Sequence, residues 1–578
     1  MPRATRASKA AASKASSKAA DTAACPVDSA GTLVPDASKK RAASVDSTEP
    51  DTKKTKLEDE GPAESFGTAQ IAKDRAALDI PLDEGCSLSA YSVYIDSDDL
   101  IWDASLNQTH AGNNHNKFYR LQLLVDSRGK DFKTWSRWGR VGERGQSAIL
   151  GDGSLDDAKS MFEKKFKDKS GLKWENRTDP PKPKKYAYVE RSYEPDEDRN
   201  DDKQTANDIM PSVVSPCTLE PAVKRLVELI FDPHMFAATM SDMRYDNEKL
   251  PLGKLSKATI LRGFEALKEI SNMIANPNTA SHGAVEDFSN LYYSLIPHVF
   301  GRDRPPVLRT ETMLKREIEL LETLTDLKDA INIMKAELGE RNSAHPLDRQ
   351  YYGLNMAEMT PLDPNQEEFK HLARYLNDTR GSTHDVTYDI EDIFRIERQG
   401  EKDRFDQSQF GASIRDRRLL WHGSRATNFG GILSQGLRIA PPEAPVSGYM
   451  FGKGVYLADM SSKSAGYCYP NISRNTALLL LCEAELGKPM YERDHGDSNG
   501  RANAAANGSW STLGRGGTMP PQWKDAACVH PSLKGVMMPA TEKKLPGPTN
   551  GSHGLLYNEY ICYDVAQIRL RYLFRIRM

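Results

Sequence analysis

The sequence has no apolar run long enough to cross a membrane. Its longest apolar run, residues 477–482, falls far short of the roughly 20 residues that a spanning helix needs. The first twenty residues are mostly alanine, serine, lysine and arginine and lack the apolar core of a signal peptide. We therefore expect no membrane contact, and a chain that stays on the cytosolic or nuclear side.

Cysteine is scarce and scattered, which argues against two kinds of small stabilised fold. No Cys-x-x-Cys pair occurs, although zinc fingers and disulfide frameworks depend on such spacings. We expect reduced thiols that are buried or idle, and we predict no metal site. The seven cysteines are Cys25, Cys86, Cys217, Cys468, Cys482, Cys528 and Cys562.

Net charge is small, but charge is unevenly distributed along the chain. The 578 residues include 78 Lys and Arg against 81 Asp and Glu, a net charge of −3. At roughly 150 residues per domain, this length predicts about three to four folded units. The local charge then indicates which partners each unit favours.

Residues 1–80 contain too few large apolar side chains to offset the entropy lost on ordering. We predict a disordered basic tail. Two basic clusters, residues 39–41 and 53–56, fit nuclear-import signals or phosphate-binding patches. Solvated surface charge explains them equally well.

Strand signals mark a small β-rich domain over residues 85–185. Residues 91–95, for example, are rich in apolar and aromatic side chains. Residues 117–185 carry 18 Lys and Arg against 10 Asp and Glu, which favours a nucleic-acid partner. Residues 190–208 hold 8 acidic against 3 basic residues and predict an acidic linker over 186–210.

From residue 211 the apolar period becomes helical, and residues 211–345 are predicted to form an all-α bundle. The clearest stripe recurs every three or four residues over roughly seven turns, as in a helix with one buried face. Its members are Leu314, Ile318, Leu321, Leu324, Leu327, Ile331, Met334 and Leu338.

Residues 346–578 mix short apolar runs with many glycine turns, which predicts a mixed α/β domain. Residues 494–517 are rich in Gly, Asn, Ala and Ser, and we expect a long loop there. Strands are predicted at residues 389–396, 477–485, 557–565 and 570–576.

Three clusters in this last domain carry candidate chemistry. Residues 419–425 (LLWHGSR) form an apolar strand ending in a polar turn, where a glycine lets a planar ligand approach the main chain. Residues 448–467 interleave glycines and hydroxyls with tyrosines that can stack on a flat heterocycle. Residues 557–561 (YNEYI) place a carboxylate within an aromatic strand. Taken singly, each cluster is also explained by a structural role.

The order of His422, Tyr456 and Glu559 resembles that in the catalytic domain of the nuclear poly(ADP-ribose) polymerases. The motifs around them are long, as in GYMFGKGVYLAD (448–459) and LLYNEYICYD (555–564). The resemblance extends upstream and covers the chain apart from its tail.

Upstream, PLGKLSK (251–257) and SLIPHVFG (294–301) are similar to the helical regulatory domain of that family, and residues 135–142 to its WGR module. The resemblance implies a multidomain α+β fold. Its parts are a small β-rich WGR domain, an all-α regulatory bundle, and a mixed α/β ADP-ribosyltransferase catalytic domain with a split antiparallel sheet.

The resemblance implies that NAD+ is the substrate and that no metal takes part. Glu559 matches the catalytic glutamate that binds ribose hydroxyls and orients the acceptor hydroxyl, and Lys463 matches a lysine beside it. By the same match, His422 holds the adenosine-side ribose and Tyr456 helps to fix the nicotinamide riboside. A carboxylate also suits a transition state that develops positive charge.

The nicotinamide itself is expected to lie among further matching residues. Gly423 through its backbone and Ser464 through its hydroxyl would clamp the carboxamide, and Tyr467 would stack on the ring. Four other residues match pocket positions of the family, and these are Ser424, Asn428, Arg438 and Tyr449.

The WGR-like domain has its own case for nucleic acid, because basic and aromatic residues are interleaved there. Core packing of Trp135 or Trp138 is the competing explanation. In the family, Trp138, Gly139 and Arg140 fall in the motif that links a DNA end to the helical domain. The resemblance implies a bundle that blocks NAD+ until DNA loosens it.

We therefore expect a nuclear, DNA-break-activated poly(ADP-ribose) polymerase that modifies proteins, itself included, in DNA damage response and repair. Its expected partners are damaged DNA ends or nicks, NAD+ and protein acceptors. A mono-ADP-ribosyltransferase, which the presence of Glu559 disfavours, and a catalytically silent DNA-end-binding scaffold are the alternatives. The sequence leaves open the preferred lesion, the acceptor residue, the polymer length, an accessory factor that completes the active site, DNA binding by the tail, and the role of residues 494–523, which depart from family composition.

Overall fold

The computed structural model describes residues 70–72, 78, 80–191, 193, 215–247, 250, 252–278, 283–335, 344–382, 386–540 and 553–578. The predicted tail up to residue 69 and most of the predicted linker lie outside the described residues. The chain divides into two compact units, Met1–Gly61 and Pro62–Met578, and every described residue belongs to the second.

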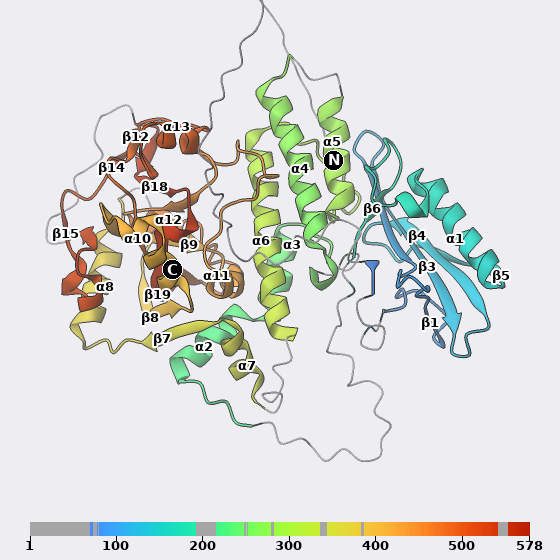
Figure 1. Ribbon diagram of the computed structural model, residues 1–578, viewed down its shortest axis with the longest axis horizontal. Helices are drawn as coiled ribbons and strands as arrows, with labels where there is room; N and C mark the ends of the chain where they lie inside the picture. Colours follow the sequence, from blue (N-terminus) through green and yellow to red (C-terminus); the bar gives the residue numbers. More distant parts are fainter. Residues whose placement is uncertain are drawn as a thin grey trace, which may run out of the picture. The chain divides into compact units, whose positions relative to one another are not determined.

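The first region is a twisted antiparallel sheet with a helix, α1 (Leu155–Ser170), across one face (Figure 1). Its strand order is β5-β4-β3-β2-β6, with β1 also paired to β3. The side chain of Ser154 caps the start of α1, and Gly171 ends it with a φ of 74°. Between helix and sheet, Phe162 and Phe166 pack edge-on against Trp174. The strands are β1 (Tyr91–Val93), β2 (Asp103–His110), β3 (His115–Asp126), β4 (Phe132–Arg140), β5 (Gln146–Gly153) and β6 (Ala187–Val189).

The packed chain extends beyond both predicted boundaries of this region. Gln70, predicted to be in the tail, is fully buried, and its amide nitrogen donates to the carbonyls of Ile101 and Asp103, each at 2.7 Å. Strand β6, predicted to begin the linker, pairs with β2. Composition did not indicate these contacts because they depend on buried partners from distant parts of the chain.

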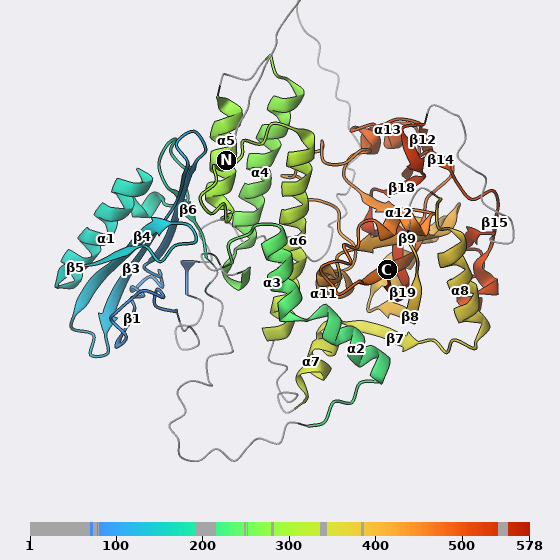
Figure 2. The same cartoon turned by 180° about the vertical axis from the view of Figure 1, so that it is seen from behind.

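The second region is helical, and α4, α5 and α6 run side by side in both views (Figures 1 and 2). The side chain of Ser256 caps α4. Along α6 the predicted stripe is buried from Leu314 to Leu327, while Leu338 lies outside the described residues. The elements are α2 (Pro221–Ile230), α3 (Pro233–Asp242), η4 (Leu252–Lys254), α4 (Lys257–Ala275), α5 (Ala284–Leu295), α6 (Glu311–Lys335) and α7 (Pro346–Gly353).

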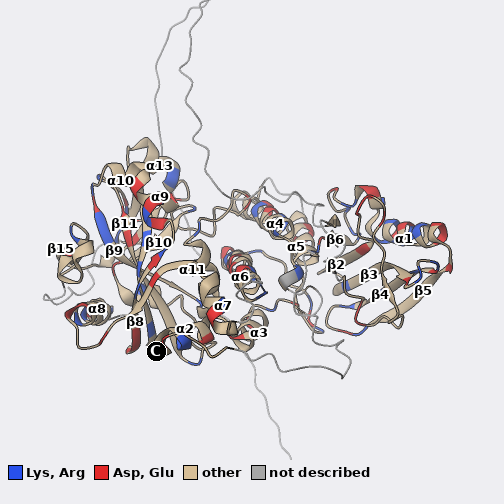
Figure 3. Cartoon of the chain, turned by 60° about the horizontal axis from the view of Figure 1, so that its bottom comes forward, with Lys and Arg blue, Asp and Glu red and all other residues tan. Residues whose placement is uncertain are grey.

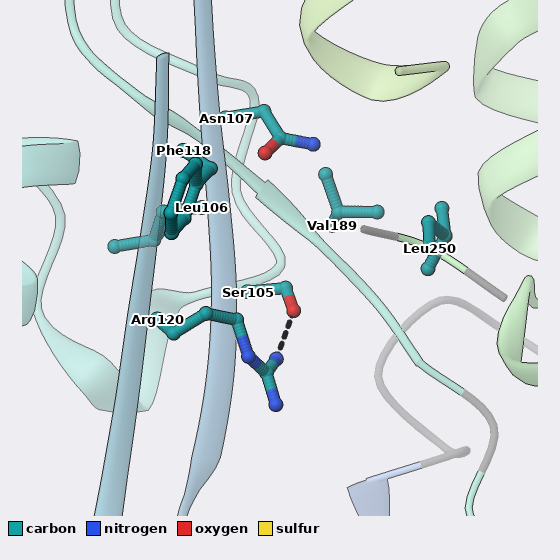
Figure 4. A pocket seen from close by; sticks show the side chains of 7 residues that line it. All are labelled: Ser105, Leu106, Asn107, Phe118, Arg120, Val189 and Leu250. Atoms are coloured by element: carbon teal, nitrogen blue, oxygen red, sulfur yellow. Dashed lines mark hydrogen bonds between the residues drawn. The ribbon is translucent and has the colours of Figure 1, made fainter. Parts of the chain in front are cut away.

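Strand β2 of the first region lies against α5 of the second. The backbone N–H of Thr109 donates to the hydroxyl of Ser294 at 2.9 Å, and that of Ala111 to the side chain of Asn290 at 2.8 Å. A gap of about 10 Å³ near this contact is lined by residues including Arg120 and Leu250 (Figure 4). That volume has room for about one water molecule at most and is too small for a substrate.

The third region contains a seven-stranded sheet of order β15-β16-β9-β11-β19-β8-β7, a four-stranded sheet of order β10-β18-β13-β12 and the pair β14-β17. The predicted multidomain α+β fold with a split sheet is thus confirmed. The strands are β7 (Met356–Pro361), β8 (Asp389–Arg398), β9 (Arg417–Ser424), β10 (Val455–Leu457), β11 (Thr476–Glu485), β12 (Tyr491–Arg493), β13 (Ser511–Gly514), β14 (Gly516–Thr518), β15 (Trp523–Asp525), β16 (Met537–Pro539), β17 (Leu555–Tyr557), β18 (Glu559–Cys562) and β19 (Ile568–Arg577).

The long loop expected over residues 494–517 is not there. An alanine-rich segment forms a short helix, α13 (Gly500–Ala506), and the buried strand β13 pairs with β18. Small residues favoured a loop in the sequence, but here they allow close packing. The other helices are α8 (Glu367–Asp378), α9 (Glu401–Gln407), α10 (Gln409–Ala412), α11 (Phe429–Gln435) and α12 (Ser461–Ala465).

Candidate active site and nucleic-acid interface

The end of strand β9 carries the first candidate cluster. Leu420 and Trp421 are fully buried and pair with β11, so packing fixes the register of the strand. At Gly423, a Cβ atom would lie 2.0 Å from the backbone oxygen of Ser464. Only glycine fits there, and the main chains of β9 and α12 therefore approach each other directly beside the cluster.

His422 is oriented by the main chain of β10. Its Nδ1 lies 3.0 Å from the carbonyl oxygen of Tyr456. Because a carbonyl oxygen only accepts, Nδ1 carries the proton and Nε2 remains an acceptor. Burial lowers the pKa of the imidazole below its ordinary value. The ring is therefore neutral at pH 7 and offers an acceptor to a hydroxyl.

Tyr456 holds the loop that precedes its own strand. Its hydroxyl accepts from the backbone N–H of Phe451 at 2.9 Å and donates to the carbonyl of Gly452 at 2.8 Å. Burial raises the pKa of this phenol well above its ordinary value, so the hydroxyl stays protonated. Its ring centroid lies 6.4 Å from that of Tyr449. Both hydrogen bonds of the Tyr456 hydroxyl are therefore made to the loop that carries Tyr449.

Helix α12 contributes a hydroxyl and leads to an aromatic ring. The hydroxyl of Ser464 donates to the carbonyl of Trp421 at 3.1 Å. Tyr467 follows the helix, its backbone N–H donates to the carbonyl of Ser464, and its side chain remains 44% exposed. The helix thus puts a buried hydroxyl against β9 and an accessible ring nearby.

Lys463 and Glu559 form an ion pair between α12 and β18. The distance from Lys463 Nζ to Glu559 Oε1 is 2.5 Å, and the two side chains are 16% and 10% exposed. Within the described part of the chain, the second carboxylate oxygen, Oε2, is buried without a hydrogen-bond partner. A buried carboxylate oxygen without a hydrogen bond costs free energy of folding. It can therefore accept a hydrogen bond from the hydroxyl of a bound ligand.

Two backbone pairings connect these elements. Trp421 of β9 forms a bridge with Ala458, just after β10, and Tyr456 of β10 pairs with Ile561 of β18. The structure therefore brings His422, Gly423, Tyr456, Lys463, Ser464 and Glu559 onto four adjoining elements.

Ser424 and Asn428 form a hydrogen-bonded pair at the C-terminal end of β9. The side-chain nitrogen of Asn428 donates to the hydroxyl of Ser424 at 3.0 Å. Among the residues with described positions, its side-chain oxygen has no partner although it is buried. An acceptor is thus available beside the end of the strand.

Tyr449 and Arg438 face helix α6 instead. The hydroxyl of Tyr449 donates a short hydrogen bond to the carboxylate of Glu322. The guanidinium of Arg438 pairs with Asp329 and, at 3.4 Å, with Asp326. Figure 3 marks the acidic residues of α6 in red. Two residues matched to the ligand pocket therefore contact the helical region.

Burial changes the titration of these helix acids. It raises the pKa of Glu322 and of Asp326 to about 7 in each case, above the ordinary value of a carboxyl group. Our sequence reasoning missed Glu322, Asp326 and Asp329 because it took the helix only as a core stripe. Their spacing of four and three residues on one face was the available signal.

In the first region, Trp138 lines a hollow of about 110 Å³. Its ring stacks on that of Tyr119, with centroids 5.9 Å apart and an angle of 16° between the planes. Lys169 Nζ lies 4.9 Å from the centroid of Tyr119. Burial and the nearby Lys165 lower the pKa of Lys169. The remaining lining residues are Ser136, Ala148 and Leu150.

Gly139 and Arg140 complete the WGR motif. A Cβ atom on Gly139 would lie 2.7 Å from the Cα of Gly145, so the glycine permits a close approach of main chains. Arg140 donates to the carbonyl of Gly301 at 2.7 Å and to that of Asn114 at 2.9 Å. Arg140 thus bridges the first region to the loop after α5. By contrast, Trp135 is a core residue, 2% exposed.

Among the residues that the structure describes, no group of three or more His, Cys, Asp and Glu side chains could hold a metal ion. Within the same residues, no helix is long and apolar enough to span a membrane.

Comparison with known proteins matches three domain families in the order of the three regions. Residues 102–181 match the WGR domain, residues 217–351 the regulatory domain of poly(ADP-ribose) polymerase, and residues 366–578 the catalytic domain of the same enzyme. Two relatives are similar over most of their length. Poly [ADP-ribose] polymerase 2 of Homo sapiens is 38% identical over 527 residues, 89% of this chain and 87% of the relative. Poly [ADP-ribose] polymerase 2 of Arabidopsis thaliana is 41% identical over 499 residues, 85% of this chain and 75% of the relative.

Proposed function

The chain belongs to the poly(ADP-ribose) polymerase family and is an NAD+ ADP-ribosyltransferase, and from this premise we propose that it builds poly(ADP-ribose) on protein acceptors, itself included, when DNA breaks activate it. The observation that carries the proposal is the Lys463–Glu559 ion pair with its unpartnered carboxylate oxygen. Glu559 stands on β18, next to the strand whose main chain orients His422.

The residues around this pair suit the parts of NAD+. We assign the nicotinamide carboxamide to the Gly423 main chain and the Ser464 hydroxyl, and the pyridinium ring to Tyr467, which is exposed enough to stack. The neutral His422 accepts from a hydroxyl of the adenosine-side ribose through Nε2. Tyr456 fixes the loop beside the nicotinamide riboside.

Further contacts to the substrate are assigned to the mouth of β9 and the loop above it. The buried amide oxygen of Asn428, together with Ser424, offers polar contacts to the sugar and phosphate portion. Arg438 and Tyr449 supply a cation and a ring once they leave α6. In the proposed cycle, Arg438 and Tyr449 therefore contact first the acids of α6 and then the substrate.

Chemistry begins with cleavage of the glycosidic bond, whose electron pair leaves with the neutral nicotinamide nitrogen. The ribose carbon develops positive charge, which the Glu559 carboxylate stabilises. Glu559 Oε2 accepts the hydrogen bond of the incoming hydroxyl and takes its proton as the new bond forms. Lys463 orients the carboxylate through Oε1.

Helix α6 supports a blocked resting state. It engages Arg438 and Tyr449 through Asp326, Asp329 and Glu322. We propose that NAD+ reaches these two residues only when α6 withdraws. This is a shift between a docked and a released state of the helix.

DNA is assigned to the WGR domain in the nucleus. The hollow beside Trp138, with Lys165 and Lys169 at its edge, suits a terminal phosphate and sugar. Arg140 connects the same motif to Gly301, which gives DNA binding a contact with the helical region. The proposed division keeps the order predicted as tail 1–80, WGR domain 85–185, linker 186–210, regulatory domain 211–345 and catalytic domain 346–578. The contacts of Gln70 and β6 extend the WGR unit beyond both of its predicted bounds.

Labelled NAD+ tests the proposal, with the full chain incubated with and without nicked or blunt DNA. We expect long polymer only with DNA. A single unit per site would indicate a mono-ADP-ribosyltransferase, and no label a catalytically silent scaffold. Glu559→Gln should retain NAD+ binding but lose polymer growth by more than about a hundredfold. Unchanged polymer length in that variant would contradict the role of the carboxylate.

A further inference from the structure

Asp459 is a fully buried carboxylate that none of these roles uses. It lies between β10 and α12 and has 0% exposure. Its Oδ2 accepts from the side-chain nitrogen of Asn558 at 2.8 Å and from the hydroxyl of Tyr560 at 3.0 Å. Its Oδ1 is buried without a partner among the described residues. Burial of a charge costs free energy unless hydrogen bonds compensate, so the two bonds to Oδ2 are the contacts through which the side chain acts.

Both donors to Asp459 flank Glu559 in the sequence. Side chains along a strand alternate between its two sides, so Asn558 and Tyr560 share the side opposite to Glu559. Asp459 therefore binds the side of β18 that faces away from the ion pair, through Asn558 and Tyr560. The Glu559 carboxylate lies on the opposite side, where it contacts Lys463.

The backbone of Asp459 leads into the second half of the same ion pair. Helix α12 begins at Ser461 and carries Lys463. One residue thus joins the start of the helix that bears the ammonium group to the strand that bears the carboxylate. This connection fixes the distance between the start of α12 and β18. It thereby supports the 2.5 Å contact between Lys463 Nζ and Glu559 Oε1.

Each donor is itself held by another bond. The side-chain oxygen of Asn558 accepts from the backbone N–H of Gly516 at 2.9 Å, which fixes which way its amide faces. The hydroxyl of Tyr560 accepts from the guanidinium of Arg418 at 3.2 Å. Asn558 and Tyr560 therefore have little freedom to follow Asp459 if it moves, and the network stays in one arrangement.

We propose that Asp459 is a positioning residue for the Glu559 carboxylate and sets the rate of chain elongation without touching NAD+ or the acceptor. The inference rests on the proposed function of Glu559. It predicts an effect on turnover rather than on NAD+ binding, because the Ser464 hydroxyl assigned to nicotinamide is held by the carbonyl of Trp421 on β9 and by neither donor to Asp459.

The test uses the full chain saturated with broken DNA. Asp459→Asn keeps the size of the side chain and an acceptor oxygen but removes the charge, so both hydrogen bonds weaken. We expect kcat for polymer growth to fall about tenfold, with KM for NAD+ changed by less than about twofold. Asp459→Ala should lower kcat further, because both donors lose their acceptor.

Glu485→Gln is the matched control. Glu485 is also fully buried, has one oxygen that accepts backbone N–H groups and has one oxygen without a partner among the described residues. It contacts neither donor of Asp459 through the bonds given above. Its kcat should stay within about twofold of the wild-type value. An equal loss of kcat in this control would overturn the inference, since any buried carboxylate would then do.

A double variant separates positioning from general damage. In a Glu559→Gln background, Asp459→Asn should cause no further loss of residual NAD+ consumption, because the group that it positions is gone. The same fold loss in both backgrounds, or a raised KM with unchanged kcat, would overturn the inference. If Asp459→Asn fails to fold, Tyr560→Phe removes one of the two bonds and should lower kcat about threefold. An unchanged kcat in that variant would also overturn it.

The outcomes remain distinct from those for the proposed function. A wild-type chain that makes no polymer overturns the proposed function, and this inference with it. A wild-type chain whose polymer growth ignores Asp459 overturns the inference alone.

Discussion

The helical region has two contact faces, and they differ in chemistry. Toward the WGR domain, α5 receives two buried backbone N–H groups on Ser294 and Asn290, which are neutral, and an exposed one on Glu286. Toward the catalytic domain, α6 presents Glu322 and Asp326, whose pKa values burial raises to about 7.

Neutral hydrogen bonds to backbone groups depend little on pH or salt, whereas buried carboxylates are costly and respond to both. The α5 face is therefore suited to remain bound to the WGR domain, and the α6 face to dissociate from the catalytic domain. In the proposed function, this contrast lets one bundle pass a signal from DNA to the NAD+ site.

The strongest way to break the contrast is to remove the acids of α6. Glu322→Ala, Asp326→Ala and Asp329→Ala together remove the hydrogen-bond and ion-pair partners of Tyr449 and Arg438. They should raise activity without DNA by about tenfold or more, equal to about 1.4 kcal/mol lost from the docked state. NAD+ consumption in the absence of DNA is the measurement. Glu311→Ala, which truncates an exposed acid in the first turn of the same helix, is the control and should leave it unchanged. Full DNA dependence in the triple variant would contradict the role of α6.

The opposite face should behave in the opposite way. Ser294→Ala with Asn290→Ala leaves two backbone N–H groups without partners and weakens the attachment of β2 to α5. We expect activation by DNA to fall about fivefold, while activity without DNA stays low. The ratio of activities with and without DNA is the readout, and DNA affinity by fluorescence anisotropy is the control. A rise in DNA-free activity would show that the two faces are alike.

The pH dependence sharpens the contrast. The docked α6 binds protons with a pKa of about 7 at Glu322 and Asp326, and the released helix with the lower ordinary values. Docking therefore takes up protons: its stability is complete at low pH and is lost as pH rises through about 7. DNA-free activity, as a fraction of DNA-saturated activity, should rise about fourfold from about pH 6 to about pH 8. The triple variant should be flat, and a falling wild-type curve would contradict the account.

The smallest expected effect lies on the DNA side. Lys165→Ala or Lys169→Ala should weaken binding of broken DNA about threefold each and lower the salt dependence by about one phosphate contact. Lys173→Ala is the matched control, because Lys173 is paired with Glu175 away from the hollow. Catalysis at saturating DNA should not change. A loss confined to kcat, with unchanged DNA affinity, would contradict the assignment of these lysines to the DNA interface.

Much of this architecture was predictable because the local patterns are strong. The stripe along α6 and the apolar run of β11 follow from periodicity alone. Motif order indicated His422 and Glu559, since both stand in long recognisable segments.

Other features needed the folded chain. The partner of Arg438 is an acid on α6, and the burial of Gln70 depends on carbonyls about thirty residues away. Asp459 gave no signal of its own, because its role arises only when β10 and β18 pair. Long-range contacts of this kind leave no local period in the sequence.

The most direct test of the central claim is the affinity of an unreactive NAD+ analogue for the full chain, measured by calorimetry with and without broken DNA. The account predicts weak binding by the wild-type protein without DNA. Tight binding is expected with DNA, and equally tight binding by the α6 triple variant without it. Tight binding by the wild-type protein in the absence of DNA would contradict the claim that α6 withholds Tyr449 and Arg438 from the substrate.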